Sequence, residues 1–515
     1  MQSSKLKFKV KSFLILLFLL SSYFFSRLSH LTSIPVFCDE AIYIRWAQIM
    51  RSIPSLRFIP LSDGKQPLFM WLVMPFLKFI SDPLVAGRTV SVLAGLGTMV
   101  GVGVLSYLLF EKKEIGLFAS ILYLVSPFVF FFDRMALADG LLSMFGIWFL
   151  IVAVLLINNR RLDLAMLAGI VLGLGLITKS PAVFFAILLP TTLLLLASHK
   201  KMSWKLPIIV SRQHLLAIGK IFGLWIILYL FAFAIYNILR LGPEFHMIAI
   251  RNKDYVYSLS EILKHPLSPL VDNLKSVIGW YWILLTPPIF VLGLLGIWFT
   301  LKRNLKAGLF LLIWWLIPLL AQSAIAKVYT ARYVLFTVPI FLLFSAITIE
   351  KFGWEIQSKW LAIGGLALFF LMPVCQLFLL ISAPQKAWLP INERSGYLEM
   401  WTAGYGIKEA SDYLKEVAKT QKVLVGTEGY FGTLPHGLEM YLEGVANITV
   451  IGVGQPVTEI SPKLKSALTD SRVFLLVNDS RFIVKNAGDL RLIAKYAKAV
   501  NSRGIQENLL FFELR

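Results

Sequence analysis

The stretch "VFFFDRMALADGLLSMFGIWFLIVAVLLI", residues 129–157, places three charged residues between two strongly apolar segments. The charged residues are Asp133, Arg134 and Asp139, and no further charge follows before Ile157. A charged side chain in the middle of a bilayer costs about 2.5–3.5 kcal/mol, so charges are expected where a helix end meets water. The stretch therefore predicts the end of one membrane helix, a polar turn, and the start of the next helix.

The composition of the whole chain indicates the same class of protein. Of its 515 residues, 57% are hydrophobic and 15% are charged, whereas soluble domains have about 25% charged residues. A spanning helix takes about 20 apolar residues, and runs of this kind recur from residue 12 to residue 382. The first run follows four lysines, but it is long and no small-residue cleavage site follows it. We therefore interpret it as a retained helix and not as a signal peptide.

Eleven runs are predicted to span the membrane. They are 12–32, 84–110, 115–132, 138–157, 162–178, 181–198, 215–238, 278–301, 307–326, 333–350 and 360–382. With eleven spans, the clusters of Lys and Arg in the connections all fall on one side, which the positive-inside rule identifies as cytoplasmic. The sequence thus predicts a multi-pass protein of the cell membrane with a cytoplasmic N-terminus and an extracytoplasmic C-terminal segment.

The formal net charge of +21 does not indicate nucleic-acid binding. Residues 384–515 contain 16 basic and 14 acidic residues, so nearly all of the excess lies in short loops between apolar runs. Such loops follow the positive-inside rule and attract anionic lipid headgroups. The lipid bilayer is therefore a predicted partner and nucleic acid is not, and part of the charge could serve an anionic, lipid-linked substrate.

Three segments on the predicted outer side are longer than turns: 33–83, 239–277 and 384–515. The first contains another apolar stretch, but prolines interrupt it and it has only about fourteen residues, so we expect a helix on the membrane surface. The last alternates helix-like pieces with β-rich runs such as "KVLVG" and "RVFLLVN", which is typical of an α/β domain. The predicted fold is a mainly α, polytopic membrane bundle over 1–383 and a small extracytoplasmic α/β domain over 384–515.

Two adjacent carboxylates, Asp39 and Glu40, open the helical pattern of the first outer segment. Adjacent residues on a helix point about 100° apart, so one carboxylate could take part in chemistry while its neighbour fixes the loop. Tyr43 lies four residues after Asp39 and shares its face. The alternative interpretation is that Asp39 caps the helix that follows, which is a common role for aspartate.

Asp133 and Asp139 are six residues apart and would not share a face of one continuous helix. A turn between two helices could bring both to one pocket, whereas the alternative is an ion pair between Asp133 and the neighbouring Arg134. Lys179 separates two apolar runs, and it could be functional or could simply reach lipid headgroups. An ionisable residue at the edge of a membrane helix is a functional candidate by default.

The remaining candidates are cations and one histidine of the outer side. Lys65, Arg88 and Arg332 are each interpretable as an interface anchor, but together they could neutralise a phosphate or diphosphate. His246, close to Glu244, could contact substrate or metal, although the two are more simply ordinary loop residues because no metal-site spacing is present. No cofactor is predicted with certainty, and a divalent metal is left open.

Several short motifs occur in a familiar order. They are D-E-A-x-Y at 39–43, K-x-P at 65–67, an arginine that opens the second span, Arg88, an aspartate that enters the fourth span, Asp139, and G-x-x-T-K ending at Lys179. In this order and topology the chain resembles the C-type membrane glycosyltransferases, and among them the protein O-mannosyltransferase and aminoarabinose-transferase group. The resemblance covers roughly residues 30–340.

The resemblance implies a function for the predicted outer residues. The donor would be a sugar on a polyprenyl phosphate, and the acceptor would be a protein, lipid or glycan that the sequence does not identify. Asp39 would act as the catalytic base, Glu40 and Asp139 would organise the site, and the outer cations would hold the phosphate. A polyprenyl phosphate is already an anionic leaving group, so one base and several cations suffice for a single displacement with inversion.

Two other functions are compatible with a polytopic membrane protein. A transporter or a flippase of lipid-linked glycans would be expected to show related halves and a site near the middle of the bilayer, and the sequence has no repeated halves. A polymerase or ligase that uses a lipid carrier differs from the first hypothesis only through the order of the motifs. Convergence of Asp39, Asp139, Lys65 and Lys179 on one cavity would favour the enzyme.

Overall fold

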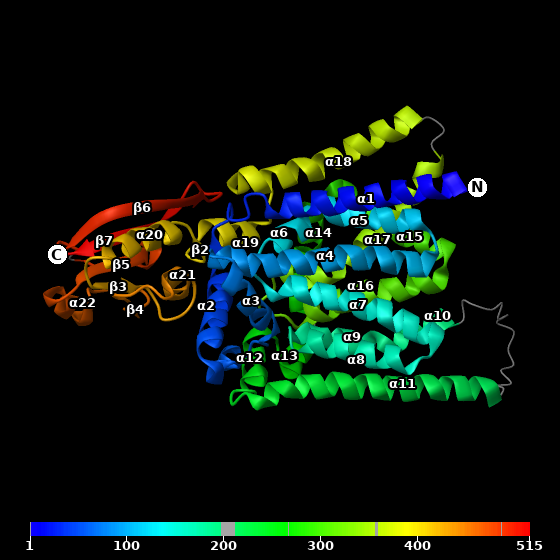
Figure 1. Cartoon of the computed structure of the whole chain (residues 1–515), viewed down its shortest axis with the longest axis horizontal. Coiled ribbons are helices and arrows are strands. Elements are labelled where there is room, and N and C mark those ends of the chain that lie inside the picture. The colour runs from blue at the N-terminus through cyan, green and yellow to red at the C-terminus, as the bar shows by residue number, and fades with distance from the viewer. Residues whose placement is uncertain (1, 197–211, 266, 356–358, 486) are drawn as a thin grey trace.

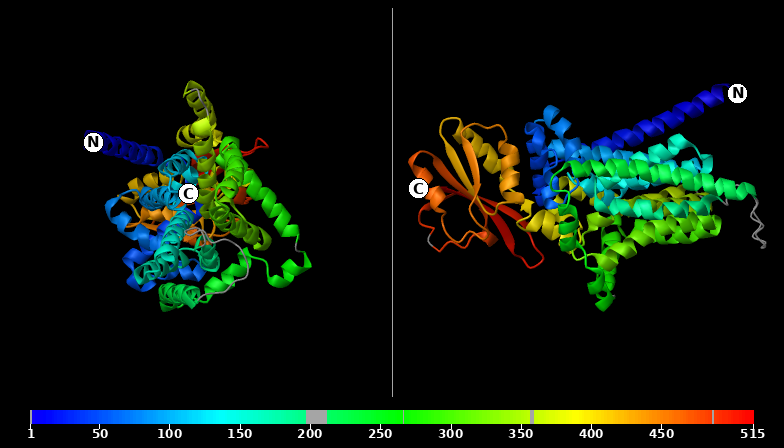
Figure 2. Two further views of the ribbon diagram at one scale, coloured as in Figure 1. Left: turned by 90° about the vertical axis from the view of Figure 1, so that its right-hand side faces the viewer. Right: turned by 90° about the horizontal axis from the view of Figure 1, so that it is seen from below.

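A bundle of long helices forms one end of the molecule and a five-stranded sheet forms the other (Figure 1). The structure is a computed structural model that describes residues 2–196, 212–265, 267–355, 359–485 and 487–515. The N-terminus lies at the end of the bundle farthest from the sheet (Figure 1). Seen from below, the orange and red sheet is confined to one end of the bundle (Figure 2).

The helices of the bundle run along its length and pack in sequence-adjacent and distant pairs. Their bounds are α1 (Gln2–Leu28), α4 (Pro83–Phe110), α5 (Lys113–Val125), α6 (Pro127–Asp133), α7 (Ala138–Asn159), α8 (Leu162–Leu176), α9 (Val183–Leu188), α10 (Leu193–Leu196), α11 (Arg212–Tyr236), α14 (Leu267–Leu285), α15 (Pro287–Arg303), α16 (Leu305–Ile325), α17 (Val338–Glu355) and α18 (Lys359–Ser382). The mainly α bundle predicted from the sequence is therefore confirmed in its class.

The predicted spans coincide with helices of different lengths. Among the described residues, five helices are long and apolar enough to cross a membrane, or up to seven if each of two bent pairs is one span. Shorter apolar helices lie at the predicted spans 12–32, 162–178, 181–198 and 360–382, so the number eleven stays a prediction. The predicted span 278–301 is not one straight helix, because α14 and α15 meet within it at 115°.

Both bends occur where a proline begins the second helix. Pro127 opens α6 after a bend of 62°, and Pro287 opens α15. A proline has no N–H to donate, and its ring disfavours helical geometry at the preceding residue. Ser126 and Thr286, which precede the two prolines, are accordingly outside the helical region of φ and ψ.

A layer of shorter helices crosses the end of the bundle that faces the sheet. Helix α2 (Cys38–Ser52) lies across the ends of the long helices, between them and the sheet (Figure 1), and α3 (Leu68–Phe79) packs against it. The second outer segment adds α12 (Met247–Tyr255) and α13 (Leu259–Lys264). The helix expected in the first outer segment is thus present as α3, and its position on a membrane surface stays a prediction.

The C-terminal segment forms the mixed sheet in the order β4-β3-β5-β7-β6. Strands β3 (Val423–Thr427), β4 (Ile448–Gly452) and β5 (Arg472–Asn478) are parallel, and β6 (Leu490–Val500) and β7 (Gln506–Leu514) extend the sheet in antiparallel register. Its helices are α19 (Ile391–Arg394), α20 (Ile407–Ala418), α21 (Thr433–Leu442) and α22 (Pro462–Ser466). This agrees with the predicted α/β segment, and its status as a separate domain stays a prediction.

The sheet region is tied to the first outer segment by backbone and side-chain contacts. Strand β1 (Val36–Phe37) pairs in antiparallel register with β2 (Ala403–Gly404), and α2 packs along α21. The Arg45 guanidinium lies 3.2 Å from the Glu439 carboxylate across this contact. The sheet region therefore contacts both the residues directly before α2 and α2 itself.

A buried ion pair fixes the start of α2 to the bundle. Arg88 of α4 donates two hydrogen bonds to Glu40, at 2.8 and 2.7 Å, and its other N–H groups bond the carbonyls of Leu31, Ile34 and Pro35. Glu40 also accepts the backbone N–H groups of Phe37 and Ala136. Because both side chains are fully buried, every donor and acceptor needs such a partner.

Asp133 and Arg134 have separate partners in the structure. Asp133 lies 3.4 Å from Arg27 and accepts hydrogen bonds from Tyr23 and Tyr123 inside the bundle. Arg134 instead bonds the carbonyl groups of residues 26, 27, 29 and 30, where α1 ends. The predicted ion pair between these two neighbours is therefore wrong, because helix ends leave carbonyls that a buried guanidinium can satisfy.

Replacing Arg88 by methionine should strongly destabilise the fold. The Arg88→Met change leaves the buried Glu40 carboxylate without its charged partner, which typically costs about 3–5 kcal/mol. Thermal unfolding of the purified protein in detergent measures the loss. As a control, Arg161→Met removes an exposed partner of Asp163 and should change stability by no more than about 0.5 kcal/mol; equal losses in the two variants would contradict the assigned role of Arg88.

Candidate active site

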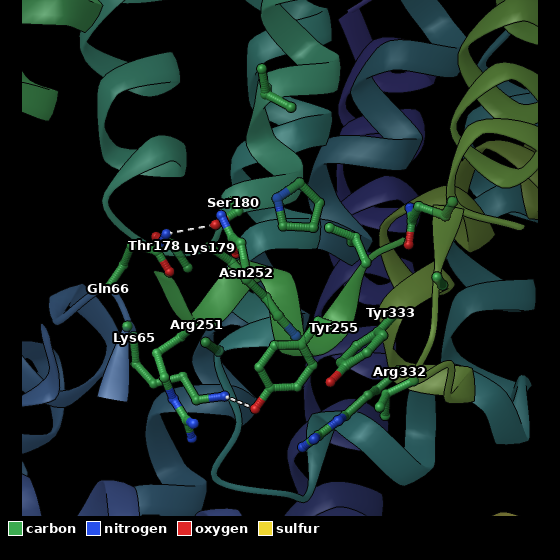
Figure 3. Close-up of a pocket in the computed structure, with 18 of the residues that line it drawn as sticks. Lys65, Gln66, Thr178, Lys179, Ser180, Arg251, Asn252, Tyr255, Arg332 and Tyr333 are labelled. Carbon is green, nitrogen blue, oxygen red and sulfur yellow. Dashed lines mark hydrogen bonds between the residues drawn. The ribbon is translucent and has the colours of Figure 1, made fainter. Parts of the chain in front are cut away.

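A cavity of about 350 Å³ lies beside α2 and α12, whose residues are part of its lining, and Figure 3 shows side chains of this lining. The lining contains cations and tyrosines together with apolar side chains, including Val183, Phe184, Ile325 and Val328. A site of this size with a few convergent polar groups has the character of a ligand pocket. The cavity therefore combines apolar and charged side chains.

Four cations from separate parts of the chain line the cavity. They are Lys65 after the 3-10 helix Ile59–Asp63, Lys179 between α8 and the 3-10 helix Ser180–Ala182, Arg251 of α12, and Arg332 of the 3-10 helix Ala331–Thr337. The predicted cations Lys65, Lys179 and Arg332 are thus brought together by the fold (Figure 3). Their convergence is a tertiary result, because they span more than 260 positions of the sequence.

Lys65 is aimed into the cavity by the turn that precedes it. Gly64 has φ +69°, and a Cβ there would lie 2.7 Å from Cβ of Arg251, so only glycine fits this position without strain. The Lys65 ammonium donates to the Tyr255 hydroxyl at 2.9 Å (Figure 3). The turn thereby brings Lys65 and Arg251 to the same end of the cavity.

The Lys65 segment is tied to the turn that carries Lys179. The Gln66 amide donates to the Ser180 hydroxyl at 2.8 Å (Figure 3), and the Leu68 N–H donates to the Ile177 carbonyl. Lys179 in turn donates to Asp139 at 2.5 Å. Asp139 lies in the first turn of α7, where a negative charge is favourable because of the helix dipole. Lys179 and Asp139 therefore form an ion pair between the segment that follows α8 and the first turn of α7.

Arg332 joins the cavity to Asp39. Its Nη2 donates to Asp39 at 2.6 Å, whereas its buried Nε has no hydrogen-bond partner. The ring of Tyr333 lies between two cations, with the Lys179 ammonium 4.3 Å and the Arg332 guanidinium 5.4 Å from its centre. Arg332 therefore lines the cavity while it holds the carboxylate of Asp39.

The cations keep Asp39 ionised. Burial raises the pKa of the Asp39 carboxyl, but the charges of Arg332 and Lys65 outweigh burial and hold this pKa below its usual value. Burial and the charge of Arg332 lower the pKa of the Lys179 ammonium to about 8, although Asp139 opposes this shift. At neutral pH the site therefore contains an ionised Asp39, and the charge of Lys179 changes just above neutrality.

Asp39 and Glu40, although adjacent in the sequence, lie in different surroundings. Glu40 is buried in the pair with Arg88 and closes the first turn of α2 through the Phe37 N–H. Asp39 faces the cations of the cavity, and Tyr43, four residues on, lines the cavity wall. The alternative that Asp39 caps α2 is wrong, since Glu40 makes the capping hydrogen bond.

Asp39 and Asp139 do not line the cavity themselves but pair with two of its cations, Arg332 and Lys179. Among the residues described, Arg88, Asp133 and His246 have no such link to it. Arg88 is fully buried and all its donors are engaged by protein groups. Asp133 is buried among Arg27 and two tyrosines, and His246 is exposed beside Glu244 at 3.7 Å. Within the part of the chain that the structure describes, no cluster of three or more His, Cys, Asp or Glu could hold a metal ion.

Several residues of the site were not predicted. Arg251 and Tyr255 belong to the second outer segment, where the run "RNKDYVY" combines cations with tyrosines on the predicted outer side. Glu393 belongs to the C-terminal segment and accepts the Ala331 N–H at 2.7 Å, next to Arg332. The cation–tyrosine run was a usable signal for the first two, and no local pattern marked Glu393.

The sequence also matches a known family over part of its length. Residues 64–236 match the family model described as dolichyl-phosphate-mannose-protein mannosyltransferase. This segment contains Lys65 and Lys179 of the cavity and Asp139, which pairs with Lys179. A search of curated proteins finds no match to the chain.

Solved structures cover nearly the whole chain. ArnT from Cupriavidus metallidurans bound to undecaprenyl phosphate is similar at a TM-score of 0.53 and 13% identity, over 97% of this chain and 97% of that chain. The resemblance to the C-type membrane glycosyltransferases is confirmed. The apo form of the same ArnT gives a TM-score of 0.52 at 12% identity, with 98% of each chain covered.

A second C-type glycosyltransferase structure has the same fold over a shorter part of its own length. The archaeal oligosaccharyltransferase AglB from Archaeoglobus fulgidus, in complex with an inhibitory peptide and a dolichol-phosphate, matches at a TM-score of 0.51 and 12% identity. The match covers 91% of this chain and 69% of AglB. The C-type fold thus extends from the helix bundle into the sheet region of this chain, beyond the residues matched by the family model.

Proposed function

We propose that this protein is a membrane glycosyltransferase that moves a sugar from a polyprenyl-phosphate-linked donor to an acceptor hydroxyl on the outer face of the membrane. The observation that carries the proposal is the convergence of Lys65, Lys179 and Arg332 on one cavity, together with the carboxylates of Asp39 and Asp139. The C-type fold supports it, and one ArnT structure of this fold contains undecaprenyl phosphate.

The lining of the cavity has groups that suit both parts of such a donor. The apolar side chains of Val183, Phe184 and Ile325 suit a polyprenyl chain that enters from the bilayer. The cations of the lining suit a phosphate, since guanidinium and ammonium groups form strong charge-assisted hydrogen bonds with phosphate oxygens.

Among the described residues, Lys65 is the cation of the site that forms no salt bridge with a carboxylate. Asp39 pairs with Arg332, Asp139 pairs with Lys179, and both Asp63 and Asp254 pair with Arg251. The Lys65 ammonium donates instead to the Tyr255 hydroxyl. Lys65 is therefore the cation that suits the single negative charge of a sugar–phosphate–polyprenyl diester.

Asp39 is proposed as the base of a single displacement. Its ionised carboxylate accepts the proton of the acceptor hydroxyl while that oxygen attacks the anomeric carbon. The bond from the anomeric carbon to the phosphate oxygen breaks, and Lys65, Lys179 and Arg332 stabilise the charge on the departing polyprenyl phosphate. Attack opposite to the leaving group inverts the configuration at the anomeric carbon.

Transport is less well supported than transfer. A transporter of this size would be expected to bind its cargo near the middle of the bilayer between two related halves. The ionisable groups of the cavity instead converge where the long helices end, beneath α2 and α12 (Figures 1 and 3). This arrangement favours a reaction at the outer surface.

Replacing Asp39 by asparagine should abolish sugar transfer without abolishing donor binding. General-base catalysis contributes about 10²–10⁴-fold to a rate, and the Asp39→Asn change should reduce transfer by this factor. Transfer is measured with a panel of polyprenyl-phosphate sugars, and binding with undecaprenyl phosphate. Asp272→Asn, an exposed carboxylate of α14, is the control and should retain wild-type rates. Wild-type transfer by Asp39→Asn would rule out the proposed base.

The affinity for a sugar–phosphate–polyprenyl donor should fall as the pH rises through about 8. The Lys179 ammonium has a pKa of about 8, so its positive charge is present below this pH and lost above it, and a hydrogen bond between charged groups is worth about tenfold in affinity or more. The Lys179→Arg variant stays charged throughout. Binding measured from pH 7 to 9 should therefore weaken in the wild type and stay nearly constant in the variant; parallel curves would contradict the role of Lys179.

A further inference from the structure

The first part of the C-terminal segment contacts residues that are next to Asp39 and Arg332 in the sequence. After α18 the chain forms α19 and a π-helical turn, Ser395–Glu399, and then β2 pairs with β1 beside Asp39. The Cys38 N–H also donates to the Thr402 carbonyl at 3.0 Å. The segment is therefore fastened to the residue that precedes Asp39.

Glu393 connects this segment to Arg332. Its side chain is 4% exposed and accepts the backbone N–H of Ala331 at 2.7 Å. Ala331 is fully buried and begins the 3-10 helix that carries Arg332. A buried backbone N–H must be bonded, so Glu393 determines where this helix starts and which way the next side chain leaves the backbone.

Aromatic packing also connects the C-terminal segment to the Arg332 guanidinium. The Tyr397 ring, one turn after Glu393, lies 4.3 Å from the Phe37 ring and 5.0 Å from the Phe131 ring, centre to centre. The Arg332 guanidinium lies 5.6 Å from the centre of the Phe37 ring. The guanidinium is therefore held between a ring fixed by the C-terminal segment and a backbone fixed by Glu393.

We infer that Glu393 is a positioning residue that holds Arg332 in the geometry required to bind the donor phosphate. The inference rests on the proposed function, and it gives the C-terminal segment a part in donor binding. Glu393 acts through the Ala331 backbone and has no contact with the donor itself. Loss of its hydrogen bond frees the start of the 3-10 helix, so that Arg332 no longer keeps its position in the lining of the cavity.

A double-mutant cycle on polyprenyl-phosphate binding tests this assignment. Glu393→Ala should weaken the binding of undecaprenyl phosphate by about tenfold, the size of a hydrogen bond to a charged group. In an Arg332→Met background the same change should weaken binding by less than about twofold, because no Arg332 guanidinium is left for Glu393 to position. The full-length protein in nanodiscs is used, and thermal unfolding of each variant reports folding.

A conservative substitution separates the hydrogen bond from other effects. Glu393→Gln keeps a carbonyl oxygen that can accept the Ala331 N–H, and it should retain affinity within about threefold of the wild type. The matched control is Glu399→Ala, which removes another carboxylate of the same segment that pairs with Arg394 at 2.6 Å and lies away from Ala331. This control should bind undecaprenyl phosphate like the wild type.

The outcomes distinguish the positioning role from the proposed function. Wild-type affinity in Glu393→Ala overturns the positioning role, and so does an equal loss in the presence and absence of Arg332, which would indicate general damage to the fold. A Glu393→Gln variant as weak as Glu393→Ala overturns the proposed route through the backbone. Wild-type protein that binds no polyprenyl phosphate overturns the proposed function instead.

Discussion

The buried pair of Glu40 and Arg88 is the constraint on which the sheet-facing end of the bundle depends. Both side chains are fully buried, and each is saturated by hydrogen bonds to the other and to backbone groups of the segment before α2 and of the turn before α7. A buried charge without a partner would be very costly, so this arrangement admits little variation. It fixes the start of α2, and Asp39 is the residue directly before Glu40.

The candidate site is built outward from this fixed point. Asp39 faces Arg332, Lys179 faces Asp139, and Lys65 is aimed by the left-handed turn at Gly64. Each cation comes from a different segment, and each is held by a hydrogen bond before any ligand arrives. In the proposed reaction such preorganisation would stabilise the charge that develops on the departing phosphate without movement of these groups.

The sheet region is part of this arrangement and not an appendage to the bundle. Pairing of β1 with β2 joins it to the start of α2, and Glu393 joins it to the backbone beside Arg332. Solved structures with the C-type glycosyltransferase fold cover this chain at 12–13% identity from the bundle into the sheet region. Because a shared fold does not by itself imply a shared function, the function of this chain has to be inferred from the residues of the candidate site.

The sequence by itself determined the class of the fold and many members of the site. Apolar runs of membrane length can form only helices that satisfy their own backbone, so the bundle was predictable, and charges at the ends of these runs pointed to Asp39, Asp139, Lys65, Lys179 and Arg332. The sequence could not assign partners, because a hydrogen bond between residues hundreds of positions apart leaves no local pattern. Only the tertiary structure decided that Arg88 pairs with Glu40 and that Asp133 lies inside the bundle. It also decided that the 278–301 run bends at Thr286, and that Glu393 bonds the backbone N–H of the residue before Arg332.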